Sequence, residues 1–192
     1  MHFSVTSKCF GARKILGPIR LNLEKGTVTA LMGASGSGKT TLLRLVAGLD
    51  QDDTGTRQPA CRIGMVFQEP RLLPWKTVLE NIELAGPENG LLNTLGLEGT
   101  AHLFPRQLSL GMARRVAFAR ALAVQPELLI LDEPFASLDA GSTELVRAHI
   151  VSLRDAGDIP IILVTHNRED ARALDAKTHI LAGSPARLTP ET

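Results

Sequence analysis

Residues 33–40, which read Gly-Ala-Ser-Gly-Ser-Gly-Lys-Thr, carry the strongest chemical signal in this chain. They match the full phosphate-loop pattern and stand between an apolar run and a helical pattern, where such a loop has to be. Glycines let the backbone approach a phosphate group closely, and the following helix N-terminus supplies free N–H groups and a positive dipole. Lys39 can neutralise phosphate charge, and the Thr40 hydroxyl can ligate Mg²⁺. The expected phosphate-binding residues are Gly33, Ala34, Ser35, Gly36, Ser37, Gly38, Lys39 and Thr40.

Two adjacent carboxylates, Asp132 and Glu133, directly follow the apolar run Leu-Leu-Ile-Leu at residues 128–131. Carboxylates at the end of a buried parallel strand lie at the edge where such sheets bind ligands. Because successive strand side chains point to opposite sides, Asp132 can hold a metal while Glu133 faces an attacking water. A buried acidic pair can also serve only as a cap, but the phosphate loop favours the chemical roles.

A sheet must hold the phosphate loop and the carboxylates at one edge. Short β-like runs alternate with helical patterns, which is typical of an α/β fold with a mainly parallel sheet. We expect strands at 28–32, 63–67, 128–132, 161–165 and 178–181. We expect helices at 40–47, 78–84, 110–124 and 140–154, with Ser109 and Asp139 as N-caps of the last two. Runs at 3–6 and 19–23 predict an N-terminal antiparallel β piece.

Composition and charge fit one soluble globular domain, residues 1–192. Hydrophobic residues make up 44% of the chain, and 21 basic against 20 acidic side chains give a net charge of +1. This balance gives no case for nucleic acid as a partner. Cys9 and Cys61 form no Cys-x-x-Cys motif, so we expect neither a zinc site nor a redox pair, and a reducing cytoplasm fits. Apolar runs are too short for a membrane span, and residues 1–14 lack a signal-peptide pattern.

The phosphate loop and carboxylates alone also fit a small nucleoside or nucleotide kinase, but further motifs favour another class. In chain order they are the phosphate loop, Gln68, Leu-Ser-Leu-Gly-Met at 108–112 before a helix with Arg114, Arg115 and Arg120, then Asp132 and Glu133, Ser-Leu-Asp at 137–139, and Val-Thr-His at 164–166. This ordered set resembles the ATP-binding cassette (ABC) of membrane transporters, over residues 3–182. The resemblance implies a P-loop NTPase core of RecA-like type at 1–68 and 126–182, and a small helical subdomain at about 72–124.

The resemblance also implies a role for each matching residue. Phe10 would stack on adenine, Thr41 would join the phosphate loop in binding ATP, and Gln68 would contact Mg²⁺ and the attacking water. His166 would contact the γ-phosphate. The implied catalytic residues are Lys39, Glu133 and His166, and the implied metal ligands are Thr40, Gln68 and Asp132.

The signature residues, by the same resemblance, would complete the ATP site of an opposite subunit. They are Ser109, Leu110, Gly111 and Met112. The implied assembly is a head-to-tail dimer, with a second copy or a related ATPase subunit, that sandwiches two ATP molecules. Leu110 and Met112 stand where the family has Gly and Gln, so the polar contact of that Gln is lost. Asp139 would lie at the dimer seam, although its N-cap role alone also explains it.

The remaining partners implied by the resemblance belong to a membrane. Integral membrane permease subunits would dock near residues 71–76, a segment that contains Trp75, and a substrate-binding protein would supply the cargo. The chain would then lie on the cytoplasmic face of the inner or plasma membrane. Residues 66–82 look most like importers of the nitrate, sulfonate and taurine group, whereas cargo and direction stay open. The segment at 55–62 looks abbreviated, since the family usually has a longer strand pair there.

Two alternatives to a transport ATPase remain at this point. An ABC-type ATPase that acts on DNA would carry coiled-coil arms of many heptads and usually a basic surface, and the sequence shows neither. A small nucleotide kinase would make two nucleoside diphosphates from ATP and a monophosphate, so its product would distinguish it from an ATPase.

Overall fold

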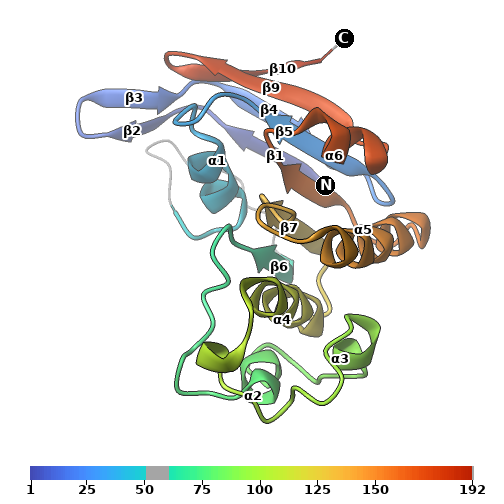
Figure 1. Cartoon of the computed structure of the whole chain (residues 1–192). Coiled ribbons are helices and arrows are strands. Elements are labelled where there is room, and N and C mark those ends of the chain that lie inside the picture. The colour runs from blue at the N-terminus through green and yellow to red at the C-terminus, as the bar shows by residue number, and fades with distance from the viewer. Residues whose placement is uncertain (51–60, 192) are drawn as a thin grey trace.

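The structure, a computed structural model, describes residues 1–50 and 61–191 (Figure 1). Residues 55–60 of the segment expected to be abbreviated lie outside the described residues. In the described part of the chain the larger sheet has eight strands in the order β2-β3-β10-β9-β5-β8-β7-β6. The chain is therefore an α/β protein with a mixed, mainly parallel sheet, as the sequence predicts.

The parallel strands carry the phosphate loop and the carboxylates. They are β5 (Val28–Met32), β6 (Ile63–Val66), β7 (Leu128–Asp132), β8 (Ile161–Val164) and β9 (Lys177–Gly183), and each starts within one residue of its predicted position. Every residue of β5, β7 and β8 is buried, because a parallel sheet is covered on both faces. The carboxyl ends of these strands meet at one edge, which fixes where a ligand can bind.

The N-terminal part holds the predicted antiparallel pair, β1 (His2–Val5) with β4 (Ile19–Asn22). Between them the chain makes a hairpin, β2 (Lys8–Phe10) and β3 (Arg13–Leu16), which the sequence pattern did not predict. This hairpin joins the larger sheet because β3 pairs with β10 (Ala186–Pro190). Strands of three to five residues whose pairing partner lies far away in the sequence, as β10 does from β3, leave little hydrophobic pattern in the local sequence.

All four predicted helices are present, and each begins within one residue of its predicted start. They are α1 (Lys39–Val46), α2 (Val78–Glu83), α4 (Leu110–Ala123) and α5 (Ala140–Asp155). Ser109 accepts a hydrogen bond from the Met112 N–H, and Asp139 accepts one from the Ser142 N–H, so both predicted N-caps are confirmed. The short α3 (Leu91–Thr94), α6 (Arg168–Ala173) and a 3₁₀ turn at Pro105–Gln107 were not predicted.

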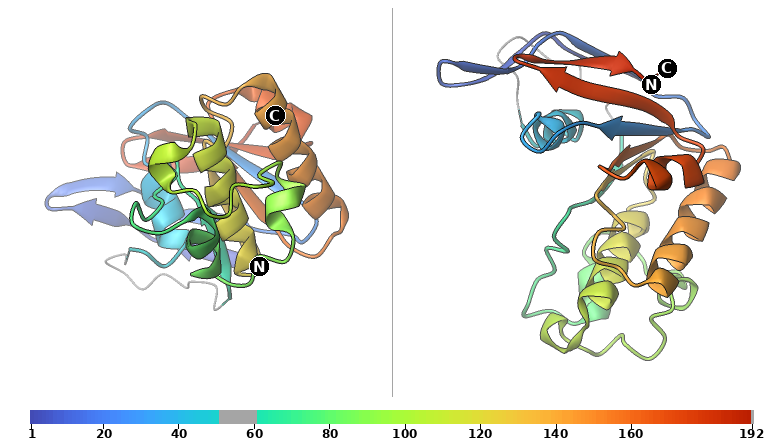
Figure 2. Two further views of the ribbon diagram at one scale, coloured as in Figure 1. Left: turned by 60° about the horizontal axis from the view of Figure 1, so that its bottom comes forward. Right: turned by 45° about the horizontal axis from the view of Figure 1, so that its top comes forward.

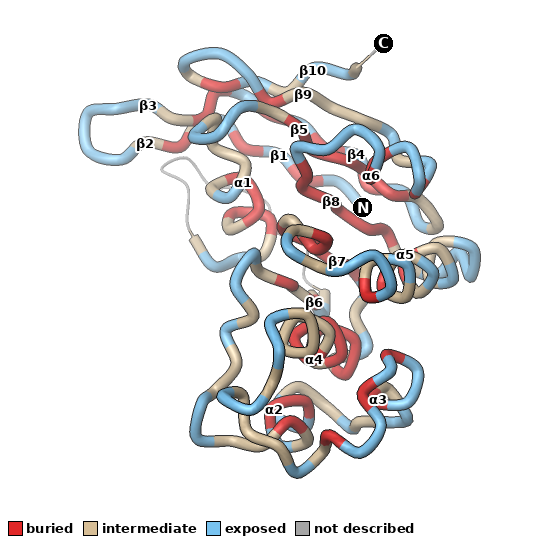
Figure 3. Tube along the Cα trace, viewed as in Figure 1, coloured by how far each residue is buried: buried red, intermediate tan, exposed pale blue. Residues whose placement is uncertain are grey.

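Buried residues follow the strands of the larger sheet and the helices packed on it (Figure 3). Among the described residues they form two apolar clusters, one on each face of the sheet. Leu129 and Leu131 of β7 pack with residues of α2, α4 and α5, whereas Leu128 and Ile130 pack with residues of α1 and the β1–β4 pair. This alternation is the two-residue period of a strand buried on both faces. Figure 2 shows α2, α3 and α4 together on one side of the sheet; we call these three helices and their connections the helical limb. Within the described residues no helix is both long and apolar enough to cross a membrane.

Candidate functional site

A cavity of about 470 Å³ lies at the carboxyl ends of β5, β7 and β8. That volume is within the range of small-molecule sites. It is lined by Phe10, Ile15, Gly33, Ser35, Gly36, Gly38, Lys39, Thr40, Thr41, Gln68, Asp132, Glu133, Val164 and His166. This cavity therefore brings together residues from the N-terminal hairpin, the phosphate loop, the segment after β6, and the ends of β7 and β8.

The phosphate loop connects β5 to α1 in the conformation that its glycines permit. Gly33 has a φ of 153°, and a Cβ there would stand 2.4 Å from the Leu181 carbonyl oxygen. The Lys39 ammonium donates hydrogen bonds to the carbonyl oxygens of Gly33 at 2.8 Å and Ala34 at 3.0 Å, so it lies across the loop. Its positive charge and the N-terminus of α1 both face the cavity, which makes this end an anion site.

Two expected loop residues, Ala34 and Ser37, do not line the cavity. Ala34 contributes through its carbonyl oxygen, which accepts from Lys39. The Ser37 hydroxyl oxygen is buried and, within the described residues, has no hydrogen-bond partner.

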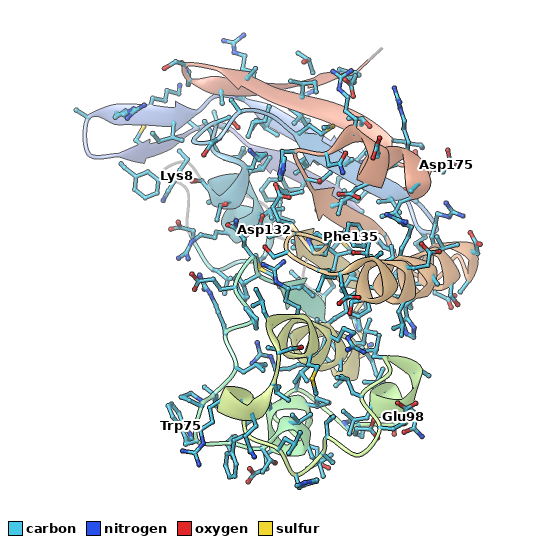
Figure 4. All side chains as sticks on the ribbon, viewed as in Figure 1. Lys8, Trp75, Glu98, Asp132, Phe135 and Asp175 are labelled. Carbon is cyan, nitrogen blue, oxygen red and sulfur yellow. The ribbon has the colours of Figure 1, made fainter. Side chains whose placement is uncertain are left out.

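Asp132 is a buried carboxylate, 5% exposed, at the end of β7 (Figure 4). Burial and the neighbouring Glu133 charge raise its pKa, while Lys39 and a hydrogen bond with Thr40 act in the opposite direction. A buried anion favours a cation beside it, and carboxylate, hydroxyl and amide oxygens are the ligands that Mg²⁺ prefers. Asp132 and Thr40, with Gln68 on the same cavity, therefore fit a magnesium site.

Glu133 and His166 form a direct contact, with 2.9 Å between Glu133 Oε1 and His166 Nδ1. This hydrogen bond and the Glu133 charge raise the pKa of His166. Glu133 has a φ of 51°, while its N–H still donates to the Val164 carbonyl oxygen at 2.9 Å. Strand β7 ends at Asp132, and Glu133 already has a left-handed backbone conformation. The different surroundings of the Asp132 and Glu133 side chains therefore result from this turn, and not from the alternation of side chains along a strand.

Phe10 comes to the cavity on the unpredicted hairpin β2–β3. Its ring is 53% exposed, and the Lys8 ammonium lies 5.1 Å from the ring centroid. Ile15 of β3 and Val164 of β8 also line the cavity. Val164 was expected only as an apolar strand residue, and Ile15 was not expected because its strand was not predicted. An exposed aromatic face at the mouth of a phosphate cavity suits stacking on a planar base.

The signature residues do not line this cavity. Ser109 caps α4, and its Oγ accepts from the Met112 N–H at 3.1 Å. Leu110 is 51% exposed, whereas Met112 packs against the apolar cluster of the helical limb. A Cβ on Gly111 would lie 3.6 Å from Asp139 Oδ2, so the two motifs are neighbours within one chain. Ser109, Leu110, Gly111 and Asp139 therefore form a surface apart from the phosphate cavity.

Comparisons with known proteins agree with this geometry. The ABC transporter family model matches residues 16–136. The aliphatic sulfonates import ATP-binding protein SsuB 2 of Burkholderia lata is 39% identical over 97% of this chain and 74% of its own length. The protein of the same name from Pseudomonas syringae pv. tomato is 39% identical over 100% of this chain and 86% of its own length.

Solved structures show the same fold. The dimeric structure of MJ0796, a bacterial ABC transporter cassette, matches with a TM-score of 0.86 and 27% identity over 100% of this chain and 98% of that chain. A post-hydrolysis state of the same cassette with ADP and Pi bound gives a TM-score of 0.84 at 28% identity. The phosphate cavity, the family match and these relatives together show that the chain belongs to the ABC transporter family, as an ATP-binding subunit that hydrolyses ATP.

Proposed function

We propose that this chain drives the import of aliphatic sulfonates, as an ATPase subunit on the cytoplasmic face of a membrane. The observation that carries the ATPase part is the single cavity in which Lys39, buried Asp132 and the Glu133–His166 pair meet. The cargo class rests on the names of relatives that are 39% identical over nearly the whole chain.

Each cavity residue has a proposed part in hydrolysis. Lys39 and the N–H groups at the start of α1 bind the phosphates, and Phe10 stacks on adenine. Thr40, Asp132 and Gln68 would hold Mg²⁺, which would neutralise phosphate charge when bound. Glu133 accepts the proton of the attacking water, and His166 holds Glu133 or the γ-phosphate in position. Catalysis is then positioning and charge stabilisation, with no covalent intermediate on the protein.

We propose that Ser109 and Gly111 act on the ATP bound by the opposite subunit. Their position outside their own cavity supports this, as does the dimeric state of the solved cassette. Ser109 stands at the N-terminus of a 14-residue helix, which favours a phosphate. Leu110 would lie at that interface with its exposed side chain, and Asp139 beside Gly111 would lie at the seam.

The membrane subunits are proposed to dock at residues 71–76. Trp75 is 69% exposed and points away from the helical limb (Figure 4). A second, mostly apolar cavity of about 400 Å³ opens between the limb and the sheet, with Phe67 and the exposed Leu49 and Leu84 in its lining. An exposed aromatic side chain and an apolar cavity are each features that suit docking of a short helix of a membrane protein. The proposed helical subdomain, residues 72–124, would then move with that helix, and a substrate-binding protein would deliver the cargo.

The test of this function is Glu133→Gln, which keeps the side-chain shape but removes the base. We expect kcat for phosphate release to fall by ~10²–10⁴-fold, with ATP affinity nearly unchanged because Lys39 and the loop are intact. Gel filtration with ATP and Mg²⁺ should show a dimer, at twice the 20.6 kDa of the single chain.

The matched control is Glu98→Gln, a change of the same type at an exposed position on the helical limb (Figure 4). Its kcat and its apparent mass in gel filtration should equal those of the wild type. Normal hydrolysis by Glu133→Gln would show that Glu133 is not the base. The cargo class is tested with the complex of this chain and its membrane subunits. If a binding protein loaded with an alkanesulfonate does not stimulate the ATPase activity of that complex, the cargo class is rejected.

A further inference from the structure

Arg120 of α4 binds the segment that follows Gln68. Its guanidinium donates to the Pro70 carbonyl oxygen at 3.0 Å and to the Arg71 carbonyl oxygen at 2.9 Å. The side chain is half-buried, and the two acceptors are 50 and 49 residues away in sequence. A planar guanidinium that holds two carbonyl oxygens fixes the orientation of the segment as well as its distance.

The segment held by Arg120 is short and folded on itself. Gln68 lines the nucleotide cavity, and three residues later Arg71 has a φ of 48°. The Arg71 guanidinium carbon lies 4.2 Å from the centroid of the Phe67 ring, so the two ends of the turn contact each other. A restraint on Pro70 and Arg71 therefore also restrains Gln68.

The other end of α4 carries the signature residues. Ser109 is its N-cap, and Arg120 lies 120 − 109 = 11 residues further along the helix, a rise of about 16 Å at about 1.5 Å per residue. Seven residues of α4, among them Val116, Phe118 and Leu122, are buried, all in the half of the helix that holds Arg120. One continuous hydrogen-bonded helix thus contacts the Gln68 segment at one end and presents Ser109 at the other.

We propose that Arg120 is a positioning residue that fixes Gln68 to α4, so that a displacement of the signature end of α4 moves Gln68 relative to the bound phosphates. This rests on the proposed function, in which Gln68 contacts Mg²⁺ and the attacking water. Loss of the link leaves ATP binding at Lys39 intact but lets Gln68 move off its place, and a misplacement of about 1 Å costs up to ~10²-fold in rate.

The same helix offers a matched control in Arg115. Its guanidinium also donates to two backbone carbonyl oxygens, those of Leu95 and Gly96, both at 2.7 Å. These acceptors directly follow α3 in the helical limb and are not part of the Gln68 segment. Arg115→Met therefore removes an equivalent pair of hydrogen bonds from α4 without releasing Gln68.

The experiment compares Arg120→Met, Arg120→Lys and Arg115→Met in the full chain, with ATP affinity, kcat and thermal unfolding measured for each. We expect Arg120→Met to lower kcat by ~10-fold or more with ATP affinity unchanged, and Arg120→Lys to recover part of it through one remaining bond. Arg115→Met should lower the melting temperature to a similar extent but leave kcat near the wild-type value. In a Gln68→Ala background, Arg120→Met should cause no further loss, because the two residues then act in one chain of contacts.

Two outcomes with the methionine variants overturn the inference. One is an equal loss of kcat in Arg120→Met and Arg115→Met, and the other is full additivity of Arg120→Met with Gln68→Ala. If Arg120→Met does not fold, Arg120→Lys still tests the inference. A kcat of Arg120→Lys equal to that of the wild type would contradict a restraint that needs both hydrogen bonds. A wild-type chain without ATPase activity in its full complex would instead reject the proposed function, and this inference with it.

Discussion

Gly64 of β6 lies against the backbone of α4, and alanine at this position tests how far the site depends on that packing. A Cβ there would lie 2.3 Å from the Ala121 carbonyl oxygen of α4 and 3.2 Å from Leu129 Cδ1. The nearest atom belongs to the backbone of a helix, so it cannot turn aside as a flexible side chain could. Gly64 does not have a positive φ, so alanine adds a steric conflict without backbone strain.

The size of the effect follows from this distance. Ordinary contact begins at about 3.4 Å, so α4 has to move away from β6 by 3.4 − 2.3 = 1.1 Å. Overpacking of a well-packed core costs about 1–3 kcal/mol, and at about 2–4 °C per kcal/mol the melting temperature should fall by roughly 2–12 °C. Because α4 carries both Ser109 and Arg120, a shift of this size should also lower kcat, by up to ~10²-fold.

The assay is thermal unfolding followed by circular dichroism, with phosphate release and ATP affinity measured on the same preparation. ATP affinity should stay near the wild-type value, because β5 and the phosphate loop lie elsewhere in the sheet. Gly17→Ala is the control: this glycine also lacks a positive φ, and its nearest neighbours would be 3.4 Å from the new Cβ. We expect it to be neutral or to stabilise by ~0.4–1 kcal/mol. If Gly64→Ala has the melting temperature and the kcat of the wild type, the reasoning is refuted.

Two further predictions concern His166 and Trp75. The imidazole of His166 should titrate above its ordinary pKa of 6.5, because Glu133 stabilises the protonated form, and Glu133→Gln should lower the midpoint seen by NMR. The contact stabilises the folded state below pH 6.5, and this contribution is lost as pH rises through the raised pKa of His166. The effect is small because the His166 side chain is 76% exposed. Equal titration midpoints in the wild type and Glu133→Gln would contradict the contact. Trp75→Asp should leave the melting temperature unchanged, since the side chain is 69% exposed, but should reduce co-purification with membrane subunits. Undiminished co-purification would rule out docking there.

Short-range features of this protein could be predicted from the sequence. The phosphate loop is eight consecutive residues whose glycines and helix start determine its shape locally. The starts of β5, β7 and β8 follow from mostly apolar runs, and the caps Ser109 and Asp139 act within three residues of their own position. Each of these depends on contacts within one element or one turn, so the order of residues is enough to indicate it.

Only the tertiary structure decided which of these features meet. The order of strands in the sheet places His166 2.9 Å from Glu133, 33 residues away, and pairs β3 with β10 so that Phe10 reaches the cavity. Arg120 was recognisable in the sequence only as a helical arginine, and its bonds to Pro70 and Arg71 depend on how α4 packs on β6. Sequence spacing indicates neither strand order nor the direction of a side chain between elements. The chemistry of single motifs is therefore local, whereas the site that combines them is a product of sheet topology and helix packing.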